Sequence, residues 1–192
     1  MEAPRRPRTP IGWFFRLRAR EPSAFRRSPR ALAHPHPWPQ GRGFDPATNP
    51  VFAHNAIVLP DVTPAAAFEA VARPADWSRY YENAELLPPG APPPALHLDA
   101  CFEFRTFATR QRCRVLEYEA PFLLGWEARM PGNRAYHRWL FEPVDGGTRV
   151  VTEECNTGLL AHLNPVMSEA LHAAHGLWLS GLAAHLAATQ RR

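Results

Sequence analysis

The sequence predicts an α+β domain in which a curved antiparallel sheet of six to seven strands packs against one long C-terminal helix. Two observations support this prediction: strand-like segments joined by short turns fill the middle of the chain, and a long segment with helical periodicity follows them. Short turns favour antiparallel neighbours. Because a strongly twisted sheet curls around its partner, we expect an apolar cavity between the sheet and the helix.

The body of the chain begins with one strand and two short helices. Residues 52–59 alternate in hydrophobicity and are rich in β-formers, which predicts the strand. Thr63 is suited to cap a helix at Pro64–Ala72, with proline at its first position. Pro74 ends that helix, and a second short helix follows through residues 76–81.

Five further strand-like segments form the expected meander. They are separated by short turns containing Pro, Gly, Asn or Asp, which is typical of hairpin connections. The segments are Ala100–Phe107, Gln111–Glu119, Leu123–Met130, Ala135–Pro143 and Thr148–Thr157.

The long helix is expected over Asn164–Thr189, with Asn164 as its cap and Pro165 in its first turn. Its apolar residues recur at steps of three and four, which places them on one face. Such a face needs a large apolar partner, and the sheet supplies it. The residues of this face are Met167, Leu171, Ala174, His175, Trp178, Leu182 and Leu186.

Residues 1–50 differ in composition from residues 51–192. They hold ten of the 22 prolines and ten of the 22 arginines, and carry a net charge of +7, whereas the remainder carries −3. We expect a disordered Arg/Pro-rich extension, which can also be explained as a gene-model artefact, and a ligand-binding domain at 51–192. A basic anchor for anionic lipid or nucleic acid is the functional alternative for the extension. No nucleic-acid partner is expected for the acidic body.

Composition excludes several classes of chemistry. The chain has no lysine, so Schiff-base catalysis and a P-loop phosphate site are excluded. Its three cysteines fit reduced thiols in a cytoplasmic protein. No apolar stretch is long enough to span a membrane. His137, His175 and a glutamate are a conceivable metal set, but no HExxH or paired-Cys spacing supports it, so we expect no metal and no cofactor.

Four stretches of the chain together carry a resemblance to a known family. They are residues 76–84 (DWSRYYENA), 136–141 (YHRWLF), 146–154 (GGTRVVTEE) and 175–179 (HGLWL) with Gly181-Leu182. In this order they resemble the polyketide cyclase/dehydrase branch of the START/Bet v1-like (SRPBCC) superfamily, and the resemblance covers about Phe52 to Ala188. It implies a helix-grip fold with a hydrophobic, lipid-binding type of pocket, and it implies no single reaction, because the superfamily includes lipid carriers, hormone receptors and cyclases.

Two histidines and a glutamate are the predicted catalytic groups. His175 lies within the apolar face of the helix, and His137 alternates with apolar residues on its strand, so both should face the interior. Each is either a hydrogen-bonded core histidine or a proton-transfer group. Neighbours on a strand point to opposite faces, so only one of Glu153 and Glu154 faces inward. Alternation does not decide which; we select Glu154.

Eight aromatic residues are predicted to contact a ligand, although each is also suited to simple packing. Together they would line a pocket for a flat or ring-containing molecule, with Tyr80 and Tyr81 near its mouth. They are Trp77, Tyr80, Tyr81, Phe102, Phe104, Trp126, Trp139 and Trp178.

The leading hypothesis is a protein that binds a small hydrophobic molecule, aromatic or polyketide-like, in an internal cavity. A cyclase or dehydratase that uses histidine and carboxylate acid–base catalysis on such a molecule is the alternative. A co-chaperone-like interaction module is the second alternative, and it would require a filled interior and an exposed apolar patch. Sequence does not determine the oligomeric state.

Overall fold

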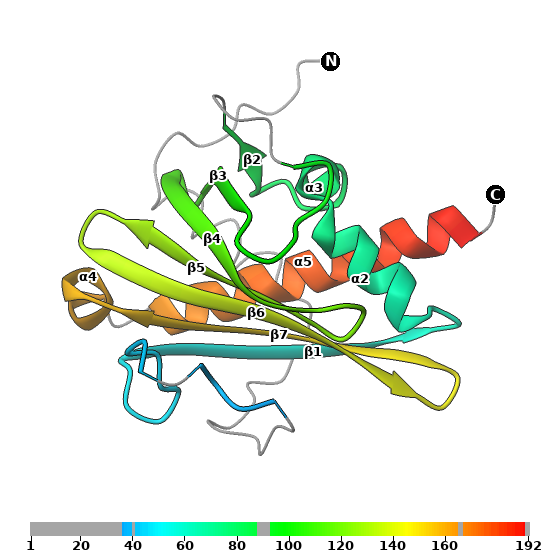
Figure 1. Cartoon of the computed structure of the whole chain (residues 1–192), viewed down its shortest axis with the longest axis horizontal. Helices are drawn as coiled ribbons and strands as arrows, with labels where there is room; N and C mark the ends of the chain where they lie inside the picture. Colours follow the sequence, from blue (N-terminus) through cyan, green and yellow to red (C-terminus); the bar gives the residue numbers. More distant parts are fainter. Residues whose placement is uncertain (1–35, 40, 88–92, 165–166, 191–192) are drawn as a thin grey trace.

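The computed structural model describes residues 36–39, 41–87, 93–164 and 167–190, and Figure 1 shows a curved sheet crossed by one long helix. Neighbouring strands are all antiparallel, in the order β1-β7-β6-β5-β4-β3-β2. The predicted helix-grip architecture is therefore confirmed. The strands are β1 (Val51–Pro60), β2 (Glu85–Leu86), β3 (Cys101–Thr106), β4 (Thr109–Glu119), β5 (Leu123–Met130), β6 (Asn133–Val144) and β7 (Gly147–Thr157).

The two short helices after β1 form as their sequence signals indicate. Thr63 caps α2 (Pro64–Ala72): its hydroxyl oxygen accepts a hydrogen bond from the backbone N–H of Ala66 at 3.2 Å. A 3₁₀ turn, η1 (Pro74–Asp76), leads directly into α3 (Trp77–Tyr80).

A short helix that the sequence did not predict precedes the long C-terminal helix. A separate helix, α4 (Leu159–Leu163), precedes α5 (Met167–Gln190). Gly158, at a φ of 116° that favours glycine, turns the chain from β7 into α4. Asn164 lies at the C-terminal end of α4, and the predicted cap of the long helix by Asn164 and Pro165 depends on residues 165–166, which lie outside the described residues.

Close approach of α3 to α5 depends on Gly181. A Cβ atom at this position would lie 1.8 Å from the carbonyl oxygen of Tyr80. The helix therefore needs a residue without a side chain there, although glycine is a poor helix former.

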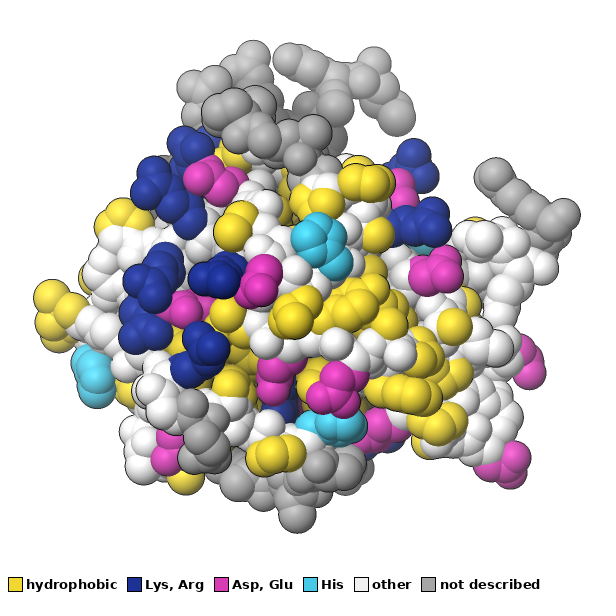
Figure 2. All heavy atoms as spheres, in the orientation of Figure 1, with side chains coloured by type: hydrophobic (Ala, Val, Ile, Leu, Met, Phe, Trp, Pro, Cys, Tyr) yellow, Lys and Arg dark blue, Asp and Glu magenta, His cyan; other side chains and the backbone are white. Residues whose placement is uncertain are grey.

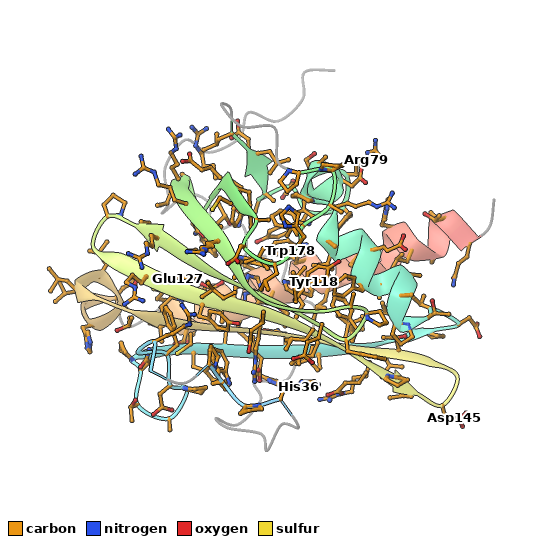
Figure 3. The ribbon with its side chains drawn as sticks, in the orientation of Figure 1. His36, Arg79, Tyr118, Glu127, Asp145 and Trp178 are labelled. Carbon is orange, nitrogen blue, oxygen red and sulfur yellow. The ribbon has the colours of Figure 1, made fainter. Side chains whose placement is uncertain are left out.

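Aromatic side chains fill the core between α5, α3 and the sheet. Trp77 is fully buried, stacks on Trp126 with ring centroids 5.7 Å apart, and meets Trp178 of α5 edge to face at 5.2 Å. Figure 3 shows Trp178 between the helix and the sheet. Its ring also stacks on that of Tyr81, with centroids 4.4 Å apart. This part of the interior is packed with rings.

The outer face of the sheet is covered by residues that precede the expected domain boundary. Phe44 is buried and packs against Tyr136, and Trp38 meets Tyr136 edge to face with centroids 5.6 Å apart. Within the segment 1–50, for which composition predicts disorder, residues 36–39 and 41–50 therefore include apolar side chains that pack on the sheet. Residues 1–35 lie outside the described part of the chain.

Buried charge holds this cover to the sheet. The guanidinium of Arg138 donates to Glu153 Oε2 at 2.8 Å and to the backbone carbonyl of His36 at 3.0 Å, and it lies 4.3 Å from the ring centroid of Trp38. Nδ1 of His54 lies 2.7 Å from the other oxygen of Glu153. Figure 3 places His36 beside the sheet on the side of β1 away from α2.

Charges of both signs are interspersed on the face shown in Figure 2. Exposed arginines of β3 and β4 pair with nearby acids, as in Arg114 with Asp99 at 2.9 Å and Arg105 with Glu85 at 3.0 Å. Such exposed pairs contribute little stability, but they leave no broad basic field on these strands. Within the described residues, none of the helices has the length and apolar character needed to cross a membrane.

Candidate functional site

A cavity of about 400 Å³ lies between the sheet and the first half of α5. Most of its lining is apolar, and its polar residues come from β3, β4, β6, β7 and α5, with Asn164 just before α5. The lining consists of Tyr81, Phe104, Thr106, Phe107, Thr109, Gln111, Ala128, Met130, Pro131, Asn133, Ala135, His137, Glu154, Asn156, Leu160, Leu163, Asn164, Met167, Ala170, Leu171, Ala174, His175 and Trp178.

Small side chains explain why the interior is open at this end. Ala128 of β5 and Ala135 of β6 are direct cross-strand partners, and both face the cavity. Ala170 and Ala174, one turn apart on α5, line it from the other side. Methyl groups on both walls leave a gap that the tryptophans fill elsewhere in the core.

The cavity reaches the surface at the end of the sheet that carries α4. Leu160 and Leu163 line it, and their exposed fractions are 47% and 68%. The turn between β5 and β6 contributes Pro131 to the same rim. The expected mouth beside the short helices is not where this opening lies: Tyr80 is absent from the lining, and Tyr81 belongs to the inner part beside Trp178.

His137, Glu154 and His175 meet on the cavity wall. Glu154 Oε2 lies 3.5 Å from Nδ1 of His137 and 3.5 Å from Nε2 of His175. The two imidazole rings stack with centroids 4.8 Å apart. The sheet register places His137 directly opposite Glu154, and α5 brings His175 over both.

Glu154 is the inward glutamate, because it shares the inner face of β7 with Thr152 and Asn156. Its Oε1 accepts a hydrogen bond from Asn156 Nδ2 at 2.8 Å, and Asn156 Oδ1 accepts one from Asn133 Nδ2 at 2.8 Å. These two hydrogen bonds fix the orientation of the Glu154 carboxylate. Glu153 points to the opposite face, where it pairs with Arg138.

The asparagines and Thr152 were missed by sequence reasoning. Nε2 of His137 lies 2.7 Å from Oγ1 of Thr152, which fixes the orientation of the imidazole. Alternation along β7 would have identified Thr152 and Asn156 as soon as Glu154 was assigned to the inner face.

The surroundings of His137 and Glu154 shift the pKa of each side chain and so set its protonation state. Burial, reinforced by the neighbouring His175, lowers the pKa of His137 to about 3 despite the opposing effect of Glu154. Burial alone would raise the pKa of Glu154, but the nearby His175 and His137 and the amide of Asn156 hold it below its ordinary value. At neutral pH, His137 is therefore neutral and Glu154 is ionised.

His175 is buried without a hydrogen-bond partner. It is 2% exposed, and neither ring nitrogen forms a hydrogen bond within the described residues, since its 3.5 Å approach to Glu154 exceeds hydrogen-bonding distance. A buried polar group in this state indicates a partner outside the chain, such as water, an ion or a ligand.

The predicted aromatic residues divide into two groups. Phe104, Tyr81 and Trp178 line the cavity. The others lie in or beside the packed core, where Trp77, Trp126 and Phe102 contact one another ring to ring. Trp126 and Trp139 also flank His137, with centroids 4.8 Å and 5.4 Å away, and so contribute to its apolar surroundings.

The fold and this wall of titratable groups define a helix-grip protein with an internal site. The family described as polyketide cyclase / dehydrase and lipid transport matches residues 54–187, and the chain belongs to this family. Family and fold together indicate a ligand-binding protein of the SRPBCC type. None of the curated proteins matches the sequence.

Solved structures share the fold. The hypothetical protein jhp0584 from Helicobacter pylori is similar with a TM-score of 0.69 and 22% identity, over 82% of this chain and 99% of that chain. Protein TTHA0849 from Thermus thermophilus is similar with a TM-score of 0.55 and 14% identity, over 72% of this chain and 98% of that chain. DynU16, a putative protein in the dynemicin biosynthetic locus, is similar with a TM-score of 0.55 and 15% identity, over 70% of this chain and 46% of that chain. At these identities the likeness shows the fold alone.

Proposed function

We propose that this protein binds one small hydrophobic, ring-containing molecule in the cavity between the sheet and α5. The observation that carries the proposal is the open interior itself: about 400 Å³, bounded largely by Ala, Met, Leu and aromatic side chains, beside a core of packed rings. Small-molecule sites are of this kind, since they begin at roughly 300 Å³ and combine an apolar lining with a few placed polar groups.

The polar groups give the ligand an orientation. Glu154 and His137 of the sheet and His175 of α5 form one polar cluster, whereas Met167 and Leu171 of α5 offer only apolar surface. A molecule with a hydroxyl or carbonyl at one end therefore places that end against the histidines, where it provides the hydrogen bond that His175 lacks.

A matched pair of α5 variants tests the binding site. Ala174→Phe fills the cavity from the helix, and Ala184→Phe adds the same ring at an exposed position of the same helix. Titration of the full chain with the uncharged dye N-phenyl-1-naphthylamine should show saturable fluorescence enhancement in wild type and in Ala184→Phe. Ala174→Phe should bind on the order of tenfold more weakly or worse.

Equal dye affinity in all three proteins would contradict binding in this cavity. Thermal unfolding of each variant shows whether a loss of binding reflects a loss of folded protein, because overpacking also destabilises.

Acid–base catalysis on the bound molecule is the second candidate function, and the meeting of His137, Glu154 and His175 is the observation that favours it. A neutral imidazole or the carboxylate removes a proton from carbon beside a carbonyl. The resulting enolate attacks a second carbonyl of the same chain, and the protonated base then assists loss of water.

The diketone 2,6-heptanedione tests this chemistry, because aldol closure and loss of one water convert it to 3-methylcyclohex-2-enone. Formation of the enone should be faster with wild type than with His137→Gln or His175→Gln, by about 10²- to 10⁴-fold for a lost proton-transfer group. If the variants that retain dye binding form the enone as fast as wild type, this mechanism is wrong.

A further inference from the structure

We propose that His137, Glu154 and His175 form a binding site for one divalent transition-metal ion, of which Zn²⁺ is the reference case. Each residue offers one ligand atom, and the three atoms lie within 4.8 Å of one another. Two imidazoles and one carboxylate are a donor set that Zn²⁺ accepts, with a fourth position left for water or a ligand.

The distances fit an ion at the centre of the three groups. Ligand atoms about 2.1 Å from a tetrahedral ion are about 3.4 Å apart. Glu154 Oε2 already lies 3.5 Å from Nδ1 of His137 and 3.5 Å from Nε2 of His175. The nitrogens of the two imidazoles, up to 4.8 Å apart, have to approach by about 1.4 Å, and the stacked rings have to tilt so that both lone pairs are directed to the ion.

Neighbouring residues orient two of the three ligands as a metal site requires. With Nε2–H of His137 donating to Thr152 Oγ1 at 2.7 Å, the Nδ1 lone pair of His137 is directed to Glu154. The far oxygen of Glu154 is held by Asn156 at 2.8 Å, which leaves Oε2 as the free ligand atom. Metal-binding histidines and carboxylates are typically fixed by such partners.

Two independent observations indicate that an ion belongs here. Both nitrogens of His175 are buried without a hydrogen bond, and the 3.5 Å approach of Nε2 to Glu154 Oε2 leaves room for an ion that would bind both groups. Glu154 is also the one acidic residue among the described residues of the cavity lining, and no arginine accompanies it there. A bound cation would satisfy the imidazole and compensate the carboxylate together.

An ion can reach the site from solvent, and one side of the site faces the open cavity. The cavity reaches the surface beside α4, so an ion can enter from solvent. Trp126 and Trp139 flank His137 on the sheet side, which leaves the cavity as the direction for the remaining coordination positions. An ion there would contact the polar end of a molecule bound in the same cavity.

Metal binding by the full chain tests the site. The exposed thiol of Cys101 is replaced by serine in every protein compared, so that it cannot bind the metal. After dialysis against EDTA, each protein is titrated with Zn²⁺ in competition with a chromophoric chelator. Co²⁺ is used in parallel because its visible d–d bands report coordination directly. We expect one ion per chain and d–d bands in the parent protein.

Glu154→Gln and His175→Gln should each weaken Zn²⁺ binding on the order of 10- to 100-fold or more. His162→Gln, which removes an exposed histidine of α4, should leave it unchanged. Zn²⁺ should raise the Tm of the parent and of His162→Gln and should not raise that of Glu154→Gln. This last readout also shows that each variant is folded.

Equal Zn²⁺ affinity in the parent and Glu154→Gln, or the absence of stoichiometric binding in the parent, would overturn the metal site. The metal-free parent is titrated with N-phenyl-1-naphthylamine in the same series. Dye binding without Zn²⁺ binding would refute the metal site and leave the proposed function standing, whereas Zn²⁺ binding without dye binding would do the reverse.

Discussion

Glu153 and Glu154 are adjacent in sequence and have different roles because β7 is buried on both faces. Glu153 pairs with Arg138 beneath the N-terminal segment, and Glu154 faces the cavity. The sequence allows either glutamate to face the interior, and only the pairing of β7 with β6 and β1 decides which one does. The same register brings His137 and Glu154 opposite each other, which no linear spacing reveals.

Replacing each glutamate by glutamine should separate the two roles. Glu153→Gln leaves Arg138 buried without its anionic partner, so the free energy of unfolding should fall by about 3 kcal/mol, at the lower end of the range for a broken buried pair. Glu154→Gln leaves no buried guanidinium behind and should change stability much less. Urea denaturation measures both. Equal losses of stability would show that the two faces are not distinguished in this way.

His137 should make the metal-free protein sensitive to acid. Its pKa is lowered to about 3 in the folded state from an ordinary 6.5, so the unfolded chain takes up a proton first as pH falls. The contribution of the buried, neutral His137 to the free energy of unfolding is present above pH 6.5 and is lost as the pH falls from 6.5 to about 3. Inside that window the free energy of unfolding of wild type should fall with a slope steeper than that of His137→Gln by about 1.4 kcal/mol per pH unit.

Denaturant unfolding of the EDTA-treated proteins at several pH values between about 4 and 6 measures these slopes; these values lie inside the window set by the two pKa values. Parallel slopes for wild type and His137→Gln would mean that His137 is solvated or protonated in the folded protein.

At the scale of elements, most of the fold was predictable from local signals. Thr63 and Pro64 mark the start of α2, short turns define the meander, and the periodic apolar face identifies α5. The short helix α4 was not predicted, because five residues, Leu159–Leu163, are too few to show a helical period. The two-residue strand β2 carries too little pattern to be recognised.

The position of the cavity also depends on more than one element. The alanines of β5, β6 and α5 are ordinary residues in sequence, and they create a gap only because register and helix placement bring them together. Most of the tryptophans expected to line the cavity instead fill the neighbouring core, since α3 inserts Trp77 between the sheet and Trp178.

Gly181 tests the packing of α3 on α5. Alanine is favoured over glycine in a helix by about 1 kcal/mol. Its methyl group would however overlap the backbone of Tyr80, and such overpacking costs typically about 1–3 kcal/mol, with a backbone obstacle at the upper end. Gly181→Ala should therefore lower the free energy of unfolding by about 2 kcal/mol. Ser180→Ala, at the adjacent position, is the control.

A stability gain in Gly181→Ala would indicate that helix propensity dominates and that α3 does not approach α5 as closely as the structure has it. Thermal and urea denaturation of the three proteins decide between these outcomes.

At the scale of the whole molecule, the domain is larger than its periodic segments. Residues 36–39 and 41–49 contain no strand or helix, yet Trp38 and Phe44 cover the outer face of β6. Sequence reasoning relies on periodicity and so placed these residues in the extension. The interior is open at one end as well, which is contrary to the filled interior that an interaction module of this fold would require.

The N-terminal cover should contribute to global stability. Phe44→Ala in the full chain removes a buried ring and should lower the free energy of unfolding by about 3–5 kcal/mol. Phe122→Ala removes a ring that is 45% exposed and serves as the matched control, with a much smaller loss. Equal effects in urea denaturation would mean that residues 36–49 do not pack on the sheet in solution.

The presence of a small molecule inside the domain is tested most directly by NMR of the full chain with ¹³C-labelled alanine methyl groups. Ala128, Ala135 and Ala174 line the cavity, whereas Ala184 and Ala188 are exposed on the same α5. With N-phenyl-1-naphthylamine bound, we expect nuclear Overhauser contacts from its ring protons to the methyl groups of Ala128, Ala135 and Ala174 and none to those of Ala184 and Ala188. A bound dye that shows no contact to Ala128, Ala135 or Ala174 would contradict this expectation.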